Sequence, residues 1–137
     1  MAVNDIRELK MHAIQGRKNV LRMIKAEGGG HLGPAFSCMD IVTALYFHTL
    51  HVDPKNPKMP ERDIFLLSAG HKAMAQYAIM AEMGYFDRSV LDTFGSFKSI
   101  IAGHPCMHLL PGIEANTGSL GQGILLGCGM ALGKRQD

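Results

Sequence analysis

Apolar positions recur with a helical period in the first part of the chain. Residues 5–27 carry apolar side chains mainly at three- and four-residue steps, which predicts one amphipathic helix. The apolar positions are Ile6, Leu9, Ala13, Val20 and Ile24. Asp5 and Glu8 have the spacing of a capping box, and the glycines at 28–30 end the helix.

The same reasoning predicts further helices, separated by loops. Prolines exclude a helix at 53–60. Residues 96–116 read as irregular, and so long an irregular segment in a compact domain is usually functional. The expected helices run from Ser37, with Asp40 in the capping position, to about Leu50, and over 73–83, 89–94 and 124–134.

One segment has no helical period. Ile64–Ser68 is a short, continuous apolar run, typical of a strand buried on both faces in a parallel sheet. Gly70 and His71 follow it, where open α/β sheets bind ligands. From the length of 137 residues we expect one domain over residues 1–137, of the α/β fold class. Because no second convincing strand is visible, we expect it to be helix-rich with a truncated parallel sheet, whose next strand lies outside these residues.

Composition narrows the class of protein. The chain has 137 residues, 47% of them hydrophobic and 19% charged, which suits a compact globular domain. A net charge of +2 offers no electrostatic reason to bind nucleic acid or an anionic membrane. Three cysteines without short spacing disfavour a disulfide framework or a cysteine-rich metal site. With no signal-peptide pattern at the N-terminus, we expect a cytoplasmic location.

A glycine-rich loop precedes the last expected helix. Residues 117–123 read Thr-Gly-Ser-Leu-Gly-Gln-Gly, so the backbone turns tightly and stays bare. Such a turn at a helix N-terminus presents free N–H groups to an anion such as a phosphate. The alternative is an ordinary turn before a small-residue helix packed in the core.

Three of the seven histidines share a setting. His31, His71 and His104 each lie in a loop directly after a glycine, where an imidazole can exchange protons near neutral pH. Their spacing matches no zinc motif. The residues alone leave open whether they share one site or are unrelated loop histidines.

Taken together, these segments resemble the transketolases. Gly-His-Leu-Gly at 30–33, Ser-Ala-Gly-His at 68–71, Gly-His-Pro at 103–105 and the 117–123 loop occur in that family's order and at similar intervals. The chain is most similar to the N-terminal, diphosphate-binding subunit of split transketolases. The resemblance implies thiamine diphosphate and Mg²⁺ as cofactors and transfer of a two-carbon ketol group between sugar phosphates.

The resemblance also implies roles for individual residues. His71 corresponds to a histidine that contacts the diphosphate. Gly118, Ser119 and Leu120 correspond to backbone that meets the cofactor, and His31 and His104 to histidines that face the bound ketose.

Parts of the family pattern are absent from residues 1–137. Neither the Gly-Asp-Gly and Asn motif that holds Mg²⁺ nor the half that binds the pyrimidine ring is present, so we expect the metal ligands beyond residue 137 or in another chain. The implied partner is a C-terminal transketolase subunit or the remainder of the enzyme, in a homo- or hetero-oligomer. The chain alone should be inactive.

Two alternatives remain. In the first, the chain is a non-catalytic remnant that acts as an interaction or dimerisation module. In the second, it is similar to a deoxyxylulose-phosphate synthase. The loop at 117–123 argues against the latter.

Overall fold

The computed structural model describes residues 2–136 and is built from helices. The α-helices are α1 (Ile6–Glu27), α2 (Leu32–Ala44), α3 (Ala73–Met83) and α4 (Gln122–Lys134). A π-helical turn, η1 (Leu45–Thr49), continues α2, and short 3₁₀ turns form η2 (Gly70–Lys72) and η3 (Arg88–Thr93). None of the helices described in this range is both long and apolar enough to cross a membrane.

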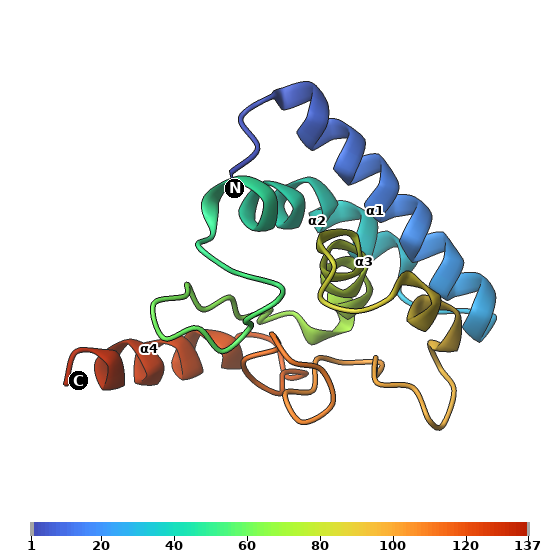
Figure 1. Ribbon diagram of the computed structural model, residues 1–137. Coiled ribbons are helices and arrows are strands. Elements are labelled where there is room, and N and C mark those ends of the chain that lie inside the picture. Colours follow the sequence, from blue (N-terminus) through green and yellow to red (C-terminus); the bar gives the residue numbers. More distant parts are fainter. Residues whose placement is uncertain (1, 137) are drawn as a thin grey trace.

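Helix α3 is the centre of the fold. Every residue from Ala73 to Ala81 is buried, and α3 packs against α1, α2 and η3 (Figure 1). Gly16 of α1 allows close packing, because a Cβ there would lie 2.5 Å from the Met39 sulfur and 2.9 Å from Ile79. The remaining core residues come from α1, α2, η1 and η3 with the adjoining Phe94, and from the irregular segment 96–116, which contributes Ile101, Leu110 and Ile113.

Two predicted helices are confirmed almost to the residue. Asp5 caps α1 by accepting a hydrogen bond from the Arg7 N–H at 2.8 Å, whereas Glu8 lies beside His12 and does not complete a capping box. Gly84 ends α3 in the left-handed conformation, as the predicted stop requires.

The predicted start of the second helix is wrong. Helix α2 begins at Leu32, not Ser37, because Pro34 falls in the first turn, where a missing N–H is tolerated. Ser37 lies inside the helix and donates to the Pro34 carbonyl, and Asp40 pairs with Arg17 instead of capping. His31 therefore stands at the N-terminus of α2.

The truncated sheet is not observed. Within residues 2–136 there is no strand, and Ile64–Ser68 is half-buried irregular backbone rather than a doubly buried strand. A strand needs a neighbour for its backbone hydrogen bonds, and none of the described segments pairs with this one.

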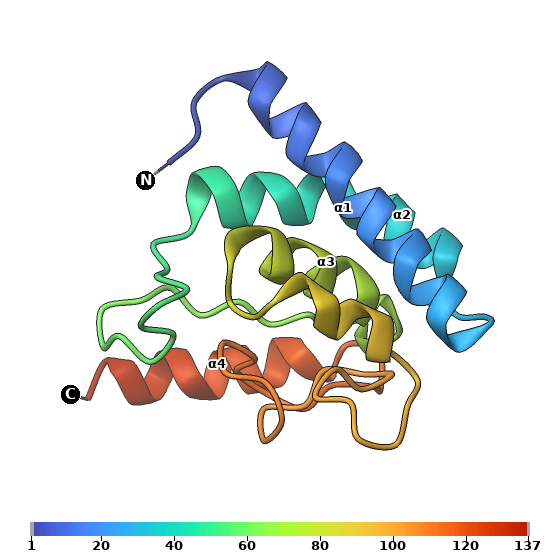
Figure 2. The same cartoon turned by 45° about the vertical axis from the view of Figure 1, so that its right-hand side comes forward.

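Helix α4 lies outside the core, along the 62–68 segment and away from α1 (Figures 1 and 2). Its contacts with that segment are Gly123 against Ser68, Gly127 against Leu66, and a hydrogen bond from the Lys134 Nζ to the Arg62 carbonyl. Because only Gly123 of α4 is buried, this helix is not the core-packed element of the alternative reading.

Candidate functional site

The turn that precedes α3 brings two of the glycine-framed histidines together. His71 lies in η2, and its ring centroid is 5.6 Å from that of His31, in an edge-on arrangement. His31 comes to this point because α2 starts directly after it and packs against η2.

The third histidine reaches the same turn from the other side. A Cβ on Gly70 would lie 2.5 Å from the Thr117 carbonyl oxygen and 2.9 Å from the His104 Cδ2. A Cβ on Gly118 would lie 3.6 Å from the same Cδ2 atom. The turn at 70–71 is therefore the common neighbour of His31, His104 and the start of the glycine-rich loop.

Hydrogen bonds tie the glycine-rich loop to the end of the 64–68 segment. The buried Thr117 hydroxyl donates to the Leu67 carbonyl at 2.7 Å, and the Gly123 N–H donates to the Ser68 hydroxyl at 3.1 Å. These two bonds hold the two ends of the loop, Thr117 and Gly123, and residues 118–121 form the tip that projects between them.

The tip of the loop is bare and exposed. Gly118, Ser119, Leu120 and Gly121 are all exposed, and Gly121 takes a left-handed φ of 88° at the start of α4. In the described part of the chain, the N–H groups of residues 118–121 have no hydrogen-bond acceptor. Free N–H groups in a turn at a helix N-terminus suit an anion.

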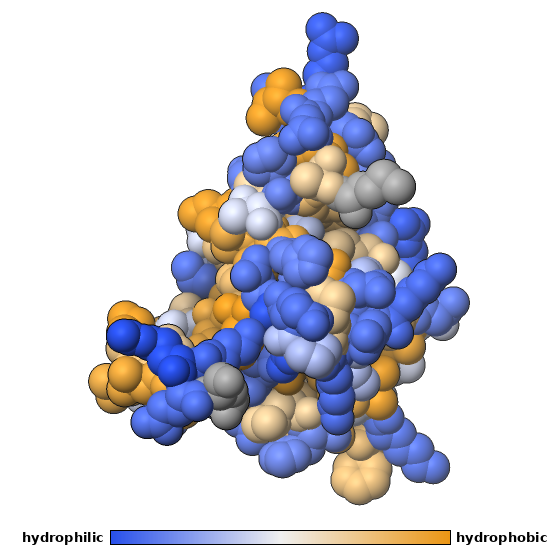
Figure 3. Space-filling model, turned by 60° about the vertical axis from the view of Figure 1, so that its left-hand side comes forward, coloured by the Kyte–Doolittle hydropathy of each residue, from blue (hydrophilic) through white to orange (hydrophobic). Residues whose placement is uncertain are grey.

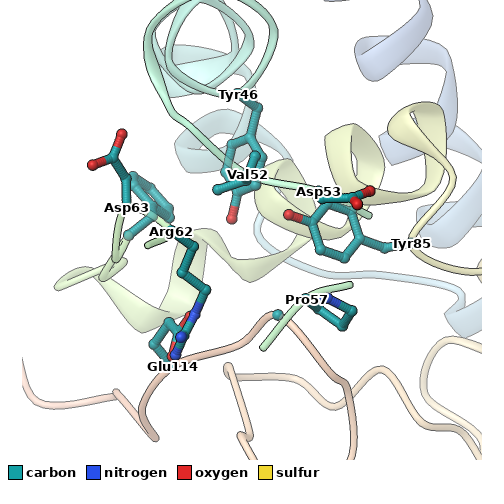
Figure 4. A pocket seen from close by; sticks show the side chains of 10 residues that line it. Tyr46, Val52, Asp53, Pro57, Arg62, Asp63, Tyr85 and Glu114 are labelled. Carbon is teal, nitrogen blue, oxygen red and sulfur yellow. The ribbon is translucent and has the colours of Figure 1, made fainter. Parts of the chain in front are cut away.

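The irregular segment 96–116 is held at two points, by α3 and by the start of the 62–68 segment. The Tyr77 hydroxyl donates to the His104 carbonyl at 3.0 Å. Arg62 holds Glu114 through two hydrogen bonds of 2.6 and 2.8 Å, and this pair raises the pKa of the guanidinium (Figure 4). The cavity beside this pair, about 10 Å³, has room for one water and not for a sugar.

Cys38 lies close to Lys72, next to His71, but it is not a candidate nucleophile. Burial raises the pKa of its thiol, against the opposing charge of Lys72, so the thiol stays protonated at neutral pH.

A protein-only metal site is not found. Across residues 2–136, no group of three or more His, Cys, Asp or Glu side chains is arranged to hold a metal ion. The site offers imidazoles and backbone N–H groups, which suit an anionic ligand, but no carboxylate set for Mg²⁺.

The structure thus brings together His31 and His71 directly, and His104 and Gly118 through Gly70. Ser119 and Leu120 follow at the exposed tip, and none of their described contacts reaches the histidines. Sequence reasoning pointed to Gly70 but missed the supporting residues Thr117 and Tyr77. Thr117 lies inside a quoted motif, whereas Tyr77 carries no signal within its apolar helix.

A family model identifies the class of proteins to which the chain belongs. The model for the transketolase, thiamine diphosphate binding domain covers residues 2–137. The chain belongs to this family.

Individual relatives in the comparison are transketolase subunits. The chain is 39% identical over 133 residues to one subunit of the apulose-4-phosphate transketolase of Phocaeicola vulgatus, covering 97% of this chain and 47% of that one. It is 40% identical over 129 residues to a 6-deoxy-6-sulfo-D-fructose transketolase subunit of a Clostridium species, covering 90% and 47%.

A solved transketolase from Leishmania mexicana superposes with a TM-score of 0.80 at 29% identity, over 85% of this chain and 18% of that chain. The chain spans about half the length of the curated subunits it matches. These matches confirm the predicted resemblance and the helix-rich transketolase N-terminal fold.

Proposed function

We propose that this chain supplies the diphosphate-binding part of a transketolase active site. The assembled enzyme transfers a two-carbon ketol group from a ketose phosphate to an aldose phosphate. The observation that carries the proposal is the bare loop 118–121, whose first residues pack against the turn that contains His71 and that neighbours His31 and His104.

The loop and His71 fit the cofactor's anionic end. Free N–H groups at 118–121 suit diphosphate oxygens, and the missing side chains at Gly118 and Gly121 let a ligand approach the backbone. We assign the imidazole of His71, in the turn beside the start of this loop, as a further donor to the same anion. Thiamine diphosphate, when bound, supplies the nucleophilic carbon with which the ketose carbon–carbon bond is broken and remade.

His31 and His104 act on the sugar. Both side chains are exposed, and they approach the 70–71 turn from different elements. Imidazoles in these positions hold the hydroxyls of the ketose and take or return the proton of the hydroxyl at the cleaved bond.

The magnesium ion that accompanies a diphosphate requires ligands from elsewhere. Oxygen ligands are what this ion prefers, and the described residues offer no such set. We therefore assign its ligands to residues outside 2–136 or to another chain.

The parallel sheet is also completed from elsewhere. Side chains of the 64–68 segment alternate as in a strand. Phe65 packs on Tyr46 with ring centroids 5.3 Å apart, while Leu66 and Ser68 face Gly127 and Gly123 of α4. Within the described residues the N–H groups of 64–67 have no acceptor, so a strand can add to this edge.

Helix α4 and the loop that precedes it expose large apolar side chains. Leu120, Ile124, Leu125 and Leu132 are 70%, 68%, 75% and 63% exposed. Figure 3 shows apolar residues exposed at the lower left edge of the molecule. A helix that is apolar all round is normally buried. We assign its cover to a C-terminal transketolase subunit, or the remainder of the enzyme, in an oligomer.

We propose sugar phosphates as the substrates, by analogy with the relative named for apulose 4-phosphate. The relative named for 6-deoxy-6-sulfo-D-fructose takes a sugar that carries a sulfo group instead. The free cysteines Cys38, Cys106 and Cys128 are consistent with our proposal of a reducing, cytoplasmic location.

The test is ketol transfer by this chain mixed with a C-terminal transketolase subunit, thiamine diphosphate and Mg²⁺. We expect activity only in the mixture. His104→Ala and His31→Ala should each lower kcat by about 10²-fold or more, since a general acid or base contributes about that much. His51→Ala, an exposed histidine on a different loop, is the matched control and should retain activity.

Absence of transfer in every mixture that forms a complex would contradict the proposal. It would favour the interaction or dimerisation module, which the exposed apolar face of α4 also fits.

A further inference from the structure

The hydroxyl of Tyr77 connects the best-packed helix of the molecule to the least regular part of the site. Tyr77 is 1% exposed in α3, and it donates to the His104 carbonyl at 3.0 Å. His104 itself is exposed and lies in the irregular segment 96–116. It therefore takes its position from contacts with other elements and not from a helix of its own.

We propose that Tyr77 is a positioning residue for His104, acting through this hydroxyl–carbonyl hydrogen bond, with Gly70 as the wall against which the imidazole rests. The catalytic consequence rests on the proposed function, whereas the geometric claim is independent of it.

The ring of His104 is placed by carbon contacts. The atom of His104 nearest to a Cβ position on Gly70 or on Gly118 is Cδ2, at 2.9 and 3.6 Å. Among the described residues, no hydrogen bond engages its ring nitrogens. The backbone is thus held from α3 and the carbon edge of the ring rests on glycine, which leaves both nitrogen atoms for a ligand.

The hydrogen bond persists over a wide pH range. Burial raises the pKa of the Tyr77 hydroxyl, so it remains a protonated donor into the alkaline range. Phe94, with its ring centroid 6.5 Å away, packs on the same side chain and keeps the ring in place when the hydroxyl is removed.

The first test uses nuclear Overhauser effects in the whole chain, without cofactor or partner. We expect a cross-peak between the His104 Hδ2 and the Gly118 Hα in the natural protein, and its loss in Tyr77→Phe. The His31–His71 cross-peaks should remain, because among the described residues neither histidine is hydrogen-bonded to Tyr77. Tyr46→Phe is the matched control, since it removes another buried hydroxyl, the one that accepts from Gln76, and should leave the His104 cross-peak unchanged.

Gly70→Ala provides a second variant should Tyr77→Phe fail to fold. Its Cβ displaces the His104 ring and the Thr117 carbonyl while the Tyr77 hydroxyl stays in place, so the same cross-peak should vanish. Retention of the cross-peak in Tyr77→Phe, or its equal loss in Tyr46→Phe, would overturn the proposal.

The second test uses the assembled enzyme. Tyr77→Phe should lower kcat in the direction of His104→Ala and leave the KM for thiamine diphosphate unchanged, whereas Tyr46→Phe should change neither. Lost cross-peaks without any ketol transfer by the natural protein would refute the proposed function and leave the positioning role standing. Full kcat in Tyr77→Phe would refute the catalytic part of the positioning role.

Discussion

The ion pair between Arg62 and Glu114 yields a quantitative prediction. It joins the irregular segment to the start of the 62–68 segment, and its side chains are only 20% and 16% exposed. Glu114→Gln replaces one acceptor oxygen with an N–H₂ group that faces a guanidinium N–H. One charge-assisted hydrogen bond is lost and the charge of Arg62 stays half-buried. We expect a loss of about 2–3 kcal/mol in the free energy of unfolding.

The assay is urea unfolding followed by circular dichroism, with the free energy obtained by linear extrapolation. In a chain of this size the same loss lowers Tm by roughly 6–12 °C. Asp40→Asn is the matched control, because Asp40 holds Arg17 with two similar hydrogen bonds but is 72% exposed. We expect it to cost less than about 1 kcal/mol. Equal losses in the two variants would refute the argument from burial.

Three further outcomes follow from local contacts. Gly123→Ala should destabilise the chain by about 1–3 kcal/mol in urea unfolding, since its Cβ would lie 2.8 Å from the Ser68 Cα, whereas Gly129→Ala, with open space around it, should be neutral or stabilising. Arg17 lowers the pKa of Asp40, so the difference in stability between the natural protein and Asp40→Asn should be full at about pH 6, above the unfolded value of about 3.9. The difference should shrink as pH falls below that value, and one that stays constant between about pH 6 and pH 2 would contradict this. Leu125→Glu, at a position 75% exposed, should reduce self-association of the isolated chain in sedimentation velocity without lowering its Tm.

Local signals predicted the elements that carry their own stop and start residues. Gly84 ends α3 where expected, and Asp5 caps the N-terminus of α1. Helix α2 starts earlier than predicted because Pro34, taken as part of a loop, is acceptable in a first turn. The earlier start of α2 matters for the site, because it sets His31 at the helix N-terminus beside His71.

Features that depend on contact with a distant segment of the chain could not be predicted from the sequence pattern. The run at 64–68 has the composition of a strand, yet a strand forms only when a second segment pairs with it, and none of the described segments does so. The support of His104 is similar. Nothing in an apolar helix marks Tyr77 as the donor to a loop that lies 27 residues further along the chain.

The most direct test of the central claim is calorimetric titration of thiamine diphosphate with Mg²⁺. It is carried out on this chain alone and on its mixture with a C-terminal transketolase subunit. We predict binding in the mixture and none by the chain alone, because the described residues supply the loop and histidines but no ligand set for the metal. No binding in the mixture would contradict the claim that residues 118–121 and His71 form part of a cofactor site. Tight, magnesium-dependent binding by the chain alone would contradict our assignment of the metal ligands.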